Sequence, residues 1–222
     1  MEALKKHLEE FPDAYQYERA AFFGVSPNCI LYALRRLNIS VKKTLTHPKS
    51  DPVKTAEFQN QLFHYQQLEQ RNIIYIDESG FATDAPRDYS YSLKGTRSYG
   101  VKDWHNKGRV NAIGAILDFN ILNVGLFEGN INADVFHAWV TQELLHSIPA
   151  NSVLVMDNAT FHKRSDSIAA IEKSGHSILF LPPYSPDLNP IEKKWAQAKS
   201  IRRKVRCDPY ELCQNLSLDE IY

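Results

Sequence analysis

The stretch IIYIDESGF, residues 73–81, begins with an apolar run of strand character that ends in the carboxylate of Asp77. A second stretch, SVLVMDNATFH, residues 152–162, has the same form and ends its apolar run at Asp157. Short continuous apolar runs are typical of strands that are buried on both faces of a sheet. Because strands end at the surface, we expect both carboxylates at a strand end, facing water at the edge of a sheet.

The rest of the chain after residue 73 alternates between strand and helix patterns. Two strands are predicted as a hairpin that turns at Asp118-Phe119-Asn120, and they are followed by helix, strand, helix, strand and helix. This order predicts an α/β fold, in which a mixed sheet is flanked by helices on its faces.

A third acidic residue, Glu192, lies on a basic helix behind the proline-rich loop PPYSPDLNP, residues 182–190. Proline continues neither a helix nor a central strand, so this loop should be rigid. Three carboxylates from distant parts of one chain can hold hard divalent cations, which prefer oxygen ligands. Two such ions about 4 Å apart can hold the attacking and leaving oxygens of a phosphodiester. We therefore predict a site for two Mg²⁺ ions, with Mn²⁺ as the alternative, in which Asp77 bridges and Asp157 and Glu192 complete the ligands.

Other polar residues near these acids have local interpretations. Glu78 should point to the face opposite Asp77, because side chains alternate along a strand. Asp187 fits turn chemistry. His162 is interpreted as an auxiliary residue that orients a phosphate or a water, or else as a residue that packs at a helix start, and Asn158 is a second auxiliary candidate. Paired carboxylates also serve glycosidases, but the basic segment after Glu192 favours a phosphate-rich substrate.

The first fifty residues predict short helices around a tight turn. Residues 2–11 and 15–23 look like amphipathic helices, and Ser26-Pro27 provides an N-cap and a first helical position for the next one. Such a helix-turn-helix can place its second helix in the major groove, although an ordinary helical hairpin has the same pattern. The DNA-contact candidates on this helix and in the linker after it are Asn28, Tyr32, Arg35, Arg36, Lys42 and Lys43.

Charge and cysteine content limit the class of protein that this chain can be. Lys and Arg number 26 and so do Asp and Glu, so only local patches favour a polyanion. The basic helix after Glu192 is one such patch, although basic runs are commonly solvated helix faces. Its DNA-contact candidates are Lys193, Lys194, Lys199, Arg202 and Arg203. Three scattered cysteines and the lack of any run near 20 apolar residues predict a cytoplasmic protein without a membrane span.

Three segments resemble the acidic motifs of mariner-type DDE transposases, in the branch found in bacterial insertion sequences: YIDESGF, VLVMDNATFH and LPPYSPDLNPIEKKWAQAK. Thirty-four residues, 158–191, separate the second and third acids, which is the spacing associated with that superfamily. The resemblance implies a ribonuclease-H-like fold with Asp77, Asp157 and Glu192 as catalytic metal ligands. It implies metal-dependent hydrolysis at the ends of a transposable element, followed by attack of the freed 3′-hydroxyl on target DNA.

The resemblance also implies partners and a division of the chain. Residues 1–47 are expected to form a small all-α helix-turn-helix unit, 48–70 a linker and packing helix, and 71–222 the ribonuclease-H-like catalytic domain. Relatives usually carry two N-terminal helical units, so the first unit is expected to be lost or separately encoded. The expected partners are terminal inverted repeats, target DNA and further subunits, in a dimer or larger complex near the bacterial nucleoid. The alternatives are a catalytically silent DNA-binding remnant that regulates transposition and a structure-specific nuclease.

Overall fold

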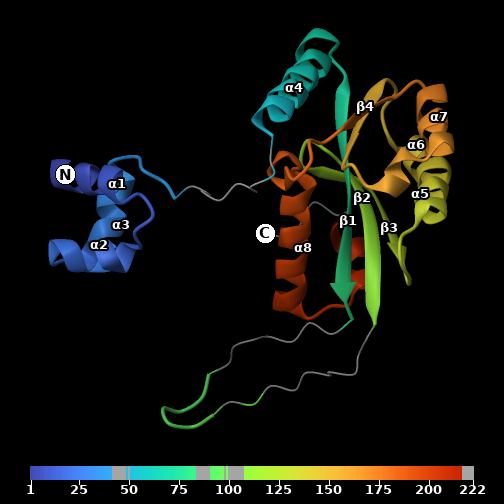
Figure 1. The fold of residues 1–222 in the computed structure, drawn as a ribbon. Coiled ribbons are helices and arrows are strands. Elements are labelled where there is room, and N and C mark those ends of the chain that lie inside the picture. The colour runs from blue at the N-terminus through green and yellow to red at the C-terminus, as the bar shows by residue number, and fades with distance from the viewer. Residues whose placement is uncertain (42–48, 50, 84–90, 98, 100–107, 217–222) are drawn as a thin grey trace. The chain divides into compact units, whose positions relative to one another are not determined.

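The structure, a computed structural model, describes residues 1–41, 49, 51–83, 91–97, 99 and 108–216 (Figure 1). The chain divides into two compact units, Met1–Thr46 and His47–Tyr222. The roles expected for residues 1–47, 48–70 and 71–222 remain predictions. Within the described ranges, no helix is both long enough and apolar enough to cross a membrane.

The first unit contains three short helices, α1 (Glu2–Glu10), α2 (Gln16–Phe23) and α3 (Pro27–Arg36). Gly24 ends α2 with a left-handed backbone (φ 63°), which glycine adopts without strain, and the hydroxyl of Ser26 caps α3 by accepting from Cys29 N. The buried apolar residues of the unit are Leu4, Ala20, Ile30 and Leu34. These helices confirm the predicted N-terminal helix-turn-helix region.

The second unit is built on a five-stranded sheet with the order β3-β2-β1-β4-β5. Its strands are β1 (Asn72–Ala82), β2 (Arg109–Leu117), β3 (Asn120–Phe127), β4 (Ser152–Met156) and β5 (Ser177–Phe180). β1, β2 and β3 pair antiparallel, whereas β4 and β5 add parallel to β1 on its other side. The predicted mixed α/β sheet is therefore confirmed.

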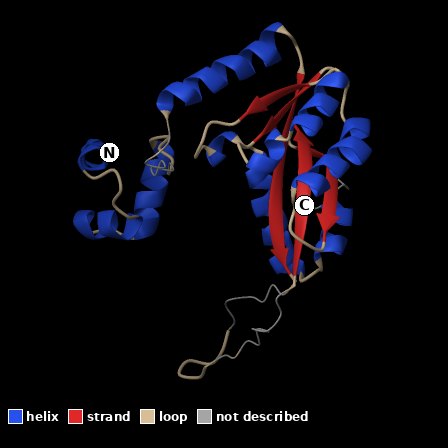
Figure 2. Ribbon diagram, turned by 45° about the vertical axis from the view of Figure 1, so that its right-hand side comes forward, coloured by secondary structure: helices blue, strands red, loops and turns tan. Residues whose placement is uncertain are grey.

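Helices cover both faces of this sheet (Figure 2). One face packs against α5 (Ala133–Trp139), its continuation through a π-helical turn and α6 (Leu145–Ser147), and α7 (Ser165–Lys173). The other face packs against α8 (Ile191–Val205) and α9 (Pro209–Leu216). A further helix, α4 (Pro52–Phe63), ends in another π-helical turn. Its residue Phe58 packs with residues of β1, β4 and β5.

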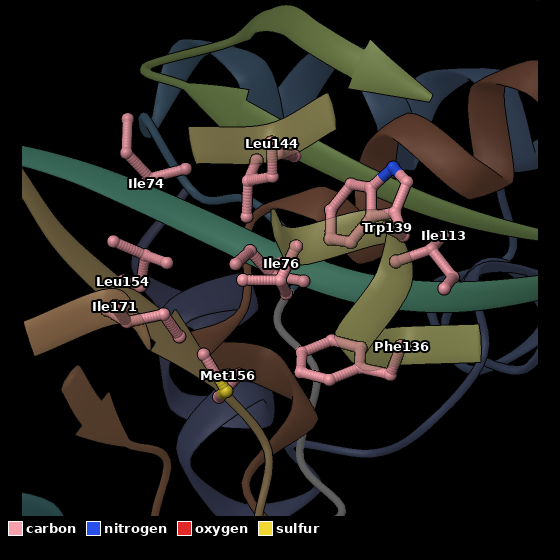
Figure 3. Packing of buried hydrophobic residues seen from close by; sticks show 11 residues of the cluster. Ile74, Ile76, Ile113, Phe136, Trp139, Leu144, Leu154, Met156 and Ile171 are labelled. Atoms are coloured by element: carbon pink, nitrogen blue, oxygen red, sulfur yellow. The ribbon is translucent and has the colours of Figure 1, made fainter. Parts of the chain in front are cut away.

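Side chains alternate strictly between these two layers along β1. Ile74 and Ile76 join the α5–α7 layer, where they pack with Phe136, Leu154 and Met156 (Figure 3). Tyr75 and Phe81 face the α8 layer instead. Because both faces of the sheet are covered, the sequences of the strands are continuous apolar runs and do not alternate between apolar and polar residues.

One expectation about β1 is wrong. The strand does not end at Asp77 but continues to Ala82, because β2 pairs with it from Ile74 through Ala82. β4 pairs only with the first part of β1, up to Tyr75 opposite Val155. Asp77 therefore lies beside the end of β4, and not at the end of its own strand, because β1 continues after its neighbour β4 has ended.

Candidate active site

Asp77 and Asp157 lie on adjacent parallel strands just past the end of their ladder. The last paired residues are Tyr75 and Val155, so each acid stands two residues beyond the same register position. Asp77 is partly buried and points to the α8 layer, like Tyr75 and Phe81, whereas Asp157 follows β4 directly and is exposed. The sheet topology therefore brings together two acids that are 80 residues apart in the chain.

Glu192 reaches this edge from the first turn of α8. Three residues later, Trp195 is buried on β2, where the Cβ of a residue larger than glycine at position 114 would lie 2.7 Å from its ring. Gly114 is the residue paired with Asp77 across the β1–β2 ladder. The bare backbone at Gly114 thus lets the helix that carries Glu192 pack closely beside the strand that carries Asp77.

Negative charge is concentrated around Asp77. Burial, together with the nearby charges of Glu192, Glu78 and Asp157, raises the pKa of Asp77 to about 7, against a usual value of 3.8. Among the described residues, no group of three or more His, Cys, Asp or Glu side chains is arranged to hold a metal ion. The donor set nevertheless has the chemistry that hard cations prefer, and a cation there would relieve the repulsion.

This pKa predicts a stability change in the metal-free protein. Because the folded pKa of Asp77 is raised, the unfolded chain releases its proton first, and stability falls as pH rises from about 4 to about 7. We expect Asp77→Asn to be more stable than the parent above pH 7, by on the order of 2 kcal/mol after allowance for partial exposure. Urea denaturation of both proteins with EDTA at pH 4.5 and pH 8 measures this. An equal difference at the two pH values would contradict it.

His162 lies between two acidic side chains. Its Nδ1 is 2.8 Å from Asp157 Oδ1 and its Nε2 is 2.8 Å from Glu78 Oε1. Burial by itself lowers the pKa of His162, but the bonds to Asp157 and Glu78 outweigh this and raise its pKa to about 9. The bond from His162 in turn lowers the pKa of Asp157. At neutral pH the ring is therefore an imidazolium that donates to both carboxylates.

Glu78 is the residue of this site that sequence reasoning missed. Its side chain points to the α5–α7 layer, as strand alternation predicted, but that layer also holds His162 beside Phe136. The signal in the sequence was its adjacency to Asp77. Adjacency alone could not reveal a partner that is 84 residues away.

Asn158 has a structural role next to Asp157. Its side-chain amide donates to the carbonyl of Leu181, which ties the end of β4 to the end of β5. It also lines a cavity of about 320 Å³ between α4 and the start of the proline-rich loop, together with Lys54 and Pro182. An auxiliary role in positioning Asp157 is consistent with this place, but it stays a prediction.

The DNA-contact candidates differ in their exposure. Asn28, Tyr32, Arg35 and Arg36 are all exposed on α3, and Lys193 and Arg203 are exposed on α8. Lys194 and Lys199 are partly buried, with the ammonium of Lys199 lying 5.8 Å from the ring centre of Phe81. Lys42 and Lys43 lie outside the described residues.

Arg202 requires a correction. Instead of facing solvent, it is 5% exposed and donates to the carbonyls of Cys207 (3.1 Å) and Thr83 (2.9 Å). The physical reason is helical spacing, since Arg202 lies on the same face of α8 as Trp195 and Ala198, which pack on the sheet. Its guanidinium joins α8 to the backbone that follows β1, so this side chain does not lie on the exposed basic face of the helix.

Comparisons with known families place both ends of the chain. Residues 72–211 match the family model described as DDE superfamily endonuclease, and residues 1–62 match one described as transposase. No significantly similar sequence was found among curated proteins.

Solved structures with a similar fold include two complexes of Mos1 transposase. The paired-end complex with the left transposon end has a TM-score of 0.59 at 18% identity, over 90% of this chain and 64% of that chain. The Mos1 strand transfer complex has a TM-score of 0.58 at 17% identity, over 96% of this chain and 67% of that one. This likeness confirms the predicted ribonuclease-H-like sheet, although the chain spans less than two thirds of the first of these proteins. Because the endonuclease model covers more than half of the chain, including all three predicted acids, the protein belongs to the DDE superfamily endonuclease family.

Proposed function

We propose that this protein is a transposase that cleaves DNA at the ends of a transposable element and transfers the freed strand into target DNA. The observation that carries the proposal is the position of Asp77, Asp157 and Glu192. They come from β1, the end of β4 and the first turn of α8, and the charges of Glu192 and Asp157 contribute to raising the pKa of Asp77. Membership of the endonuclease family supports the same chemistry.

Asp77, Asp157 and Glu192 are the residues that would hold divalent metal, and we propose two Mg²⁺ or Mn²⁺ ions. When bound, such ions supply activation of the attacking oxygen and stabilisation of charge on the phosphate. Complexes of Mos1 transposase that contain Mg and Mn support this choice of metals. The raised pKa of Asp77 supports it independently, because crowded acids favour a bound cation.

The other residues of the chain would bind and position the DNA. The exposed residues of α3 are proposed to read the terminal inverted repeat, and Lys193 and Arg203, which are exposed on α8, to contact DNA phosphates. The division of labour proposed is end recognition by residues 1–47, connection by 48–70 and catalysis by 71–222.

A dimer or larger assembly on DNA is proposed as the active form. Paired-end and strand transfer complexes of Mos1 transposase support it, as does the small surface that one helical unit can offer to DNA. The proposed place of action is the bacterial cytoplasm, in association with the nucleoid.

The test is cleavage of a labelled duplex that carries the inverted repeat flanking the coding sequence. We expect strand breaks at the repeat end with Mg²⁺ or Mn²⁺ and none with EDTA, while a scrambled duplex of the same length stays intact. Binding of the repeat without any strand break would favour a catalytically silent regulator. Metal-dependent cleavage of both duplexes alike would favour a structure-specific nuclease.

A further inference from the structure

Among the described residues, the side chain of Asp157 has hydrogen-bond partners on one carboxylate oxygen and none on the other. Its Oδ1 accepts from the backbone N of Ala159 at 2.9 Å and contacts Nδ1 of His162 at 2.8 Å. A carboxylate oxygen has two lone-pair sites, so both sites of Oδ1 are used. Of the two oxygens, Oδ2 is the one that the described residues leave for a ligand, and the charge of this carboxylate acts on nearby Asp77.

The ring of His162 is itself held on several sides. Its side chain is fully buried, with Phe136 and Phe161 at ring-centre distances of 4.5 and 4.3 Å. Behind it, Glu78 Oε1 holds the second ring nitrogen at 2.8 Å. The imidazole therefore spans from β1 to the residue after β4, which are the two segments that carry Asp77 and Asp157.

We infer that His162, supported by Glu78, is a positioning residue that makes Asp157 bind a divalent cation through Oδ2 alone. The inference rests on the proposed metal-dependent function and adds to it how one ligand is oriented. Residues that hydrogen-bond a metal ligand from behind fix its orientation and raise affinity. Single-oxygen binding also suits Mg²⁺, which keeps several waters and demands near-octahedral geometry.

The link through Glu78 gives the same imidazole a second effect. Glu78 follows Asp77 directly on β1, so a shift of Asp157 away from β1 must stretch the bonds on both sides of the ring. The His162 bridge would therefore hold the separation between the two strand-borne ligands near one value before metal arrives. Such preorganisation lowers the cost of assembling the site.

Two substitutions separate this role from simple packing. In His162→Asn the amide nitrogen can take the place of Nδ1 and donate to Asp157, but it cannot reach Glu78. In His162→Gln the amide nitrogen can take the place of Nε2 and donate to Glu78, but it leaves Asp157 Oδ1 without this partner. Both variants lose the aromatic packing, so they are matched in that respect.

The experiment measures Mn²⁺ binding to the full chain by electron paramagnetic resonance and thermal unfolding of the same samples. We expect His162→Gln to weaken Mn²⁺ binding by about 10- to 100-fold, and His162→Asn to weaken it several-fold less than that. Phe161→Leu is the control, because it removes packing against the ring and keeps both hydrogen bonds. It should lower the melting temperature with little change in Mn²⁺ affinity.

The outcomes separate the positioning role from the proposed function. Parent-like Mn²⁺ affinity in His162→Gln would overturn the positioning role and leave the metal site standing, provided that Asp77→Asn abolishes binding. Equal losses of affinity in the Asn, Gln and Phe161→Leu variants would also overturn it, since packing would then explain them. Absence of Mn²⁺ binding to the parent protein, or binding unchanged by Asp77→Asn, would overturn the metal site and with it the positioning role.

Discussion

Asp77→Asn is expected to reduce metal-dependent cleavage of the inverted-repeat duplex by at least about a thousandfold, while binding of that duplex is unchanged. Metal ions contribute several kcal/mol of transition-state stabilisation, and each 1.4 kcal/mol is a factor of ten in rate. Asp77 is central to the site, since burial and then the charges of all three neighbouring carboxylates raise its pKa. Single-turnover cleavage and a gel-shift titration on the same preparation measure the two quantities.

The control for this experiment is Asp187→Asn. Asp187 is an exposed acid of the proline-rich loop, and its removal should leave the cleavage rate within a factor of about two. Glu192→Gln and Asp157→Ala should behave like Asp77→Asn, and retained nicking by Asp157→Ala would refute the three-acid mechanism. Because Asp77→Asn is expected to stabilise the metal-free protein, its lost activity could not be explained by unfolding.

Trp195→Ala is expected to cost about 3–5 kcal/mol of folding free energy, the range for removing a large aromatic side chain from a core. Trp195 is 3% exposed, packs edge-on against Phe81 at 6.1 Å and covers the bare backbone of Gly114. Trp195→Phe should cost much less, because it keeps most of the ring and removes an indole N–H that is buried without a partner among the described residues. Urea denaturation of the three proteins gives these differences.

The position of Trp195 adds a functional consequence. Trp195 lies one helical turn after Glu192 and packs on Gly114, the residue of β2 that is paired with Asp77. A substitution that loosens the packing of α8 should therefore also displace Glu192. Gly114→Ala approaches the same contact from the other side, because the new methyl group would overlap the indole ring. If Trp195→Ala were as stable as Trp195→Phe, the contact between Trp195 and Gly114 would not be the contact that holds α8 against the sheet.

Much of this fold could be predicted from local sequence. The apolar runs before Asp77 and Asp157 predicted strands because both faces of the sheet are covered, and Ser26-Pro27 predicted the start of α3 because capping depends on adjacent residues. The end of β1 was not predictable in the same way. It depends on β2, which pairs with the residues from Glu78 to Ala82, and these residues do not form a continuous apolar run.

By itself, the sequence determined which acids to propose as metal ligands, since apolar runs that end in an acid, a proline-rich loop and the spacing between acids are all local or countable features. Tertiary structure alone decided what surrounds those acids. It brought Glu78 to His162, turned Arg202 from the expected DNA surface to two backbone carbonyls, and placed Trp195 on Gly114 opposite Asp77. The physical reason is that burial, hydrogen bonds and repulsion between charges depend on distance in space, and residues far apart in a chain acquire such distances only when a sheet and its helices pack.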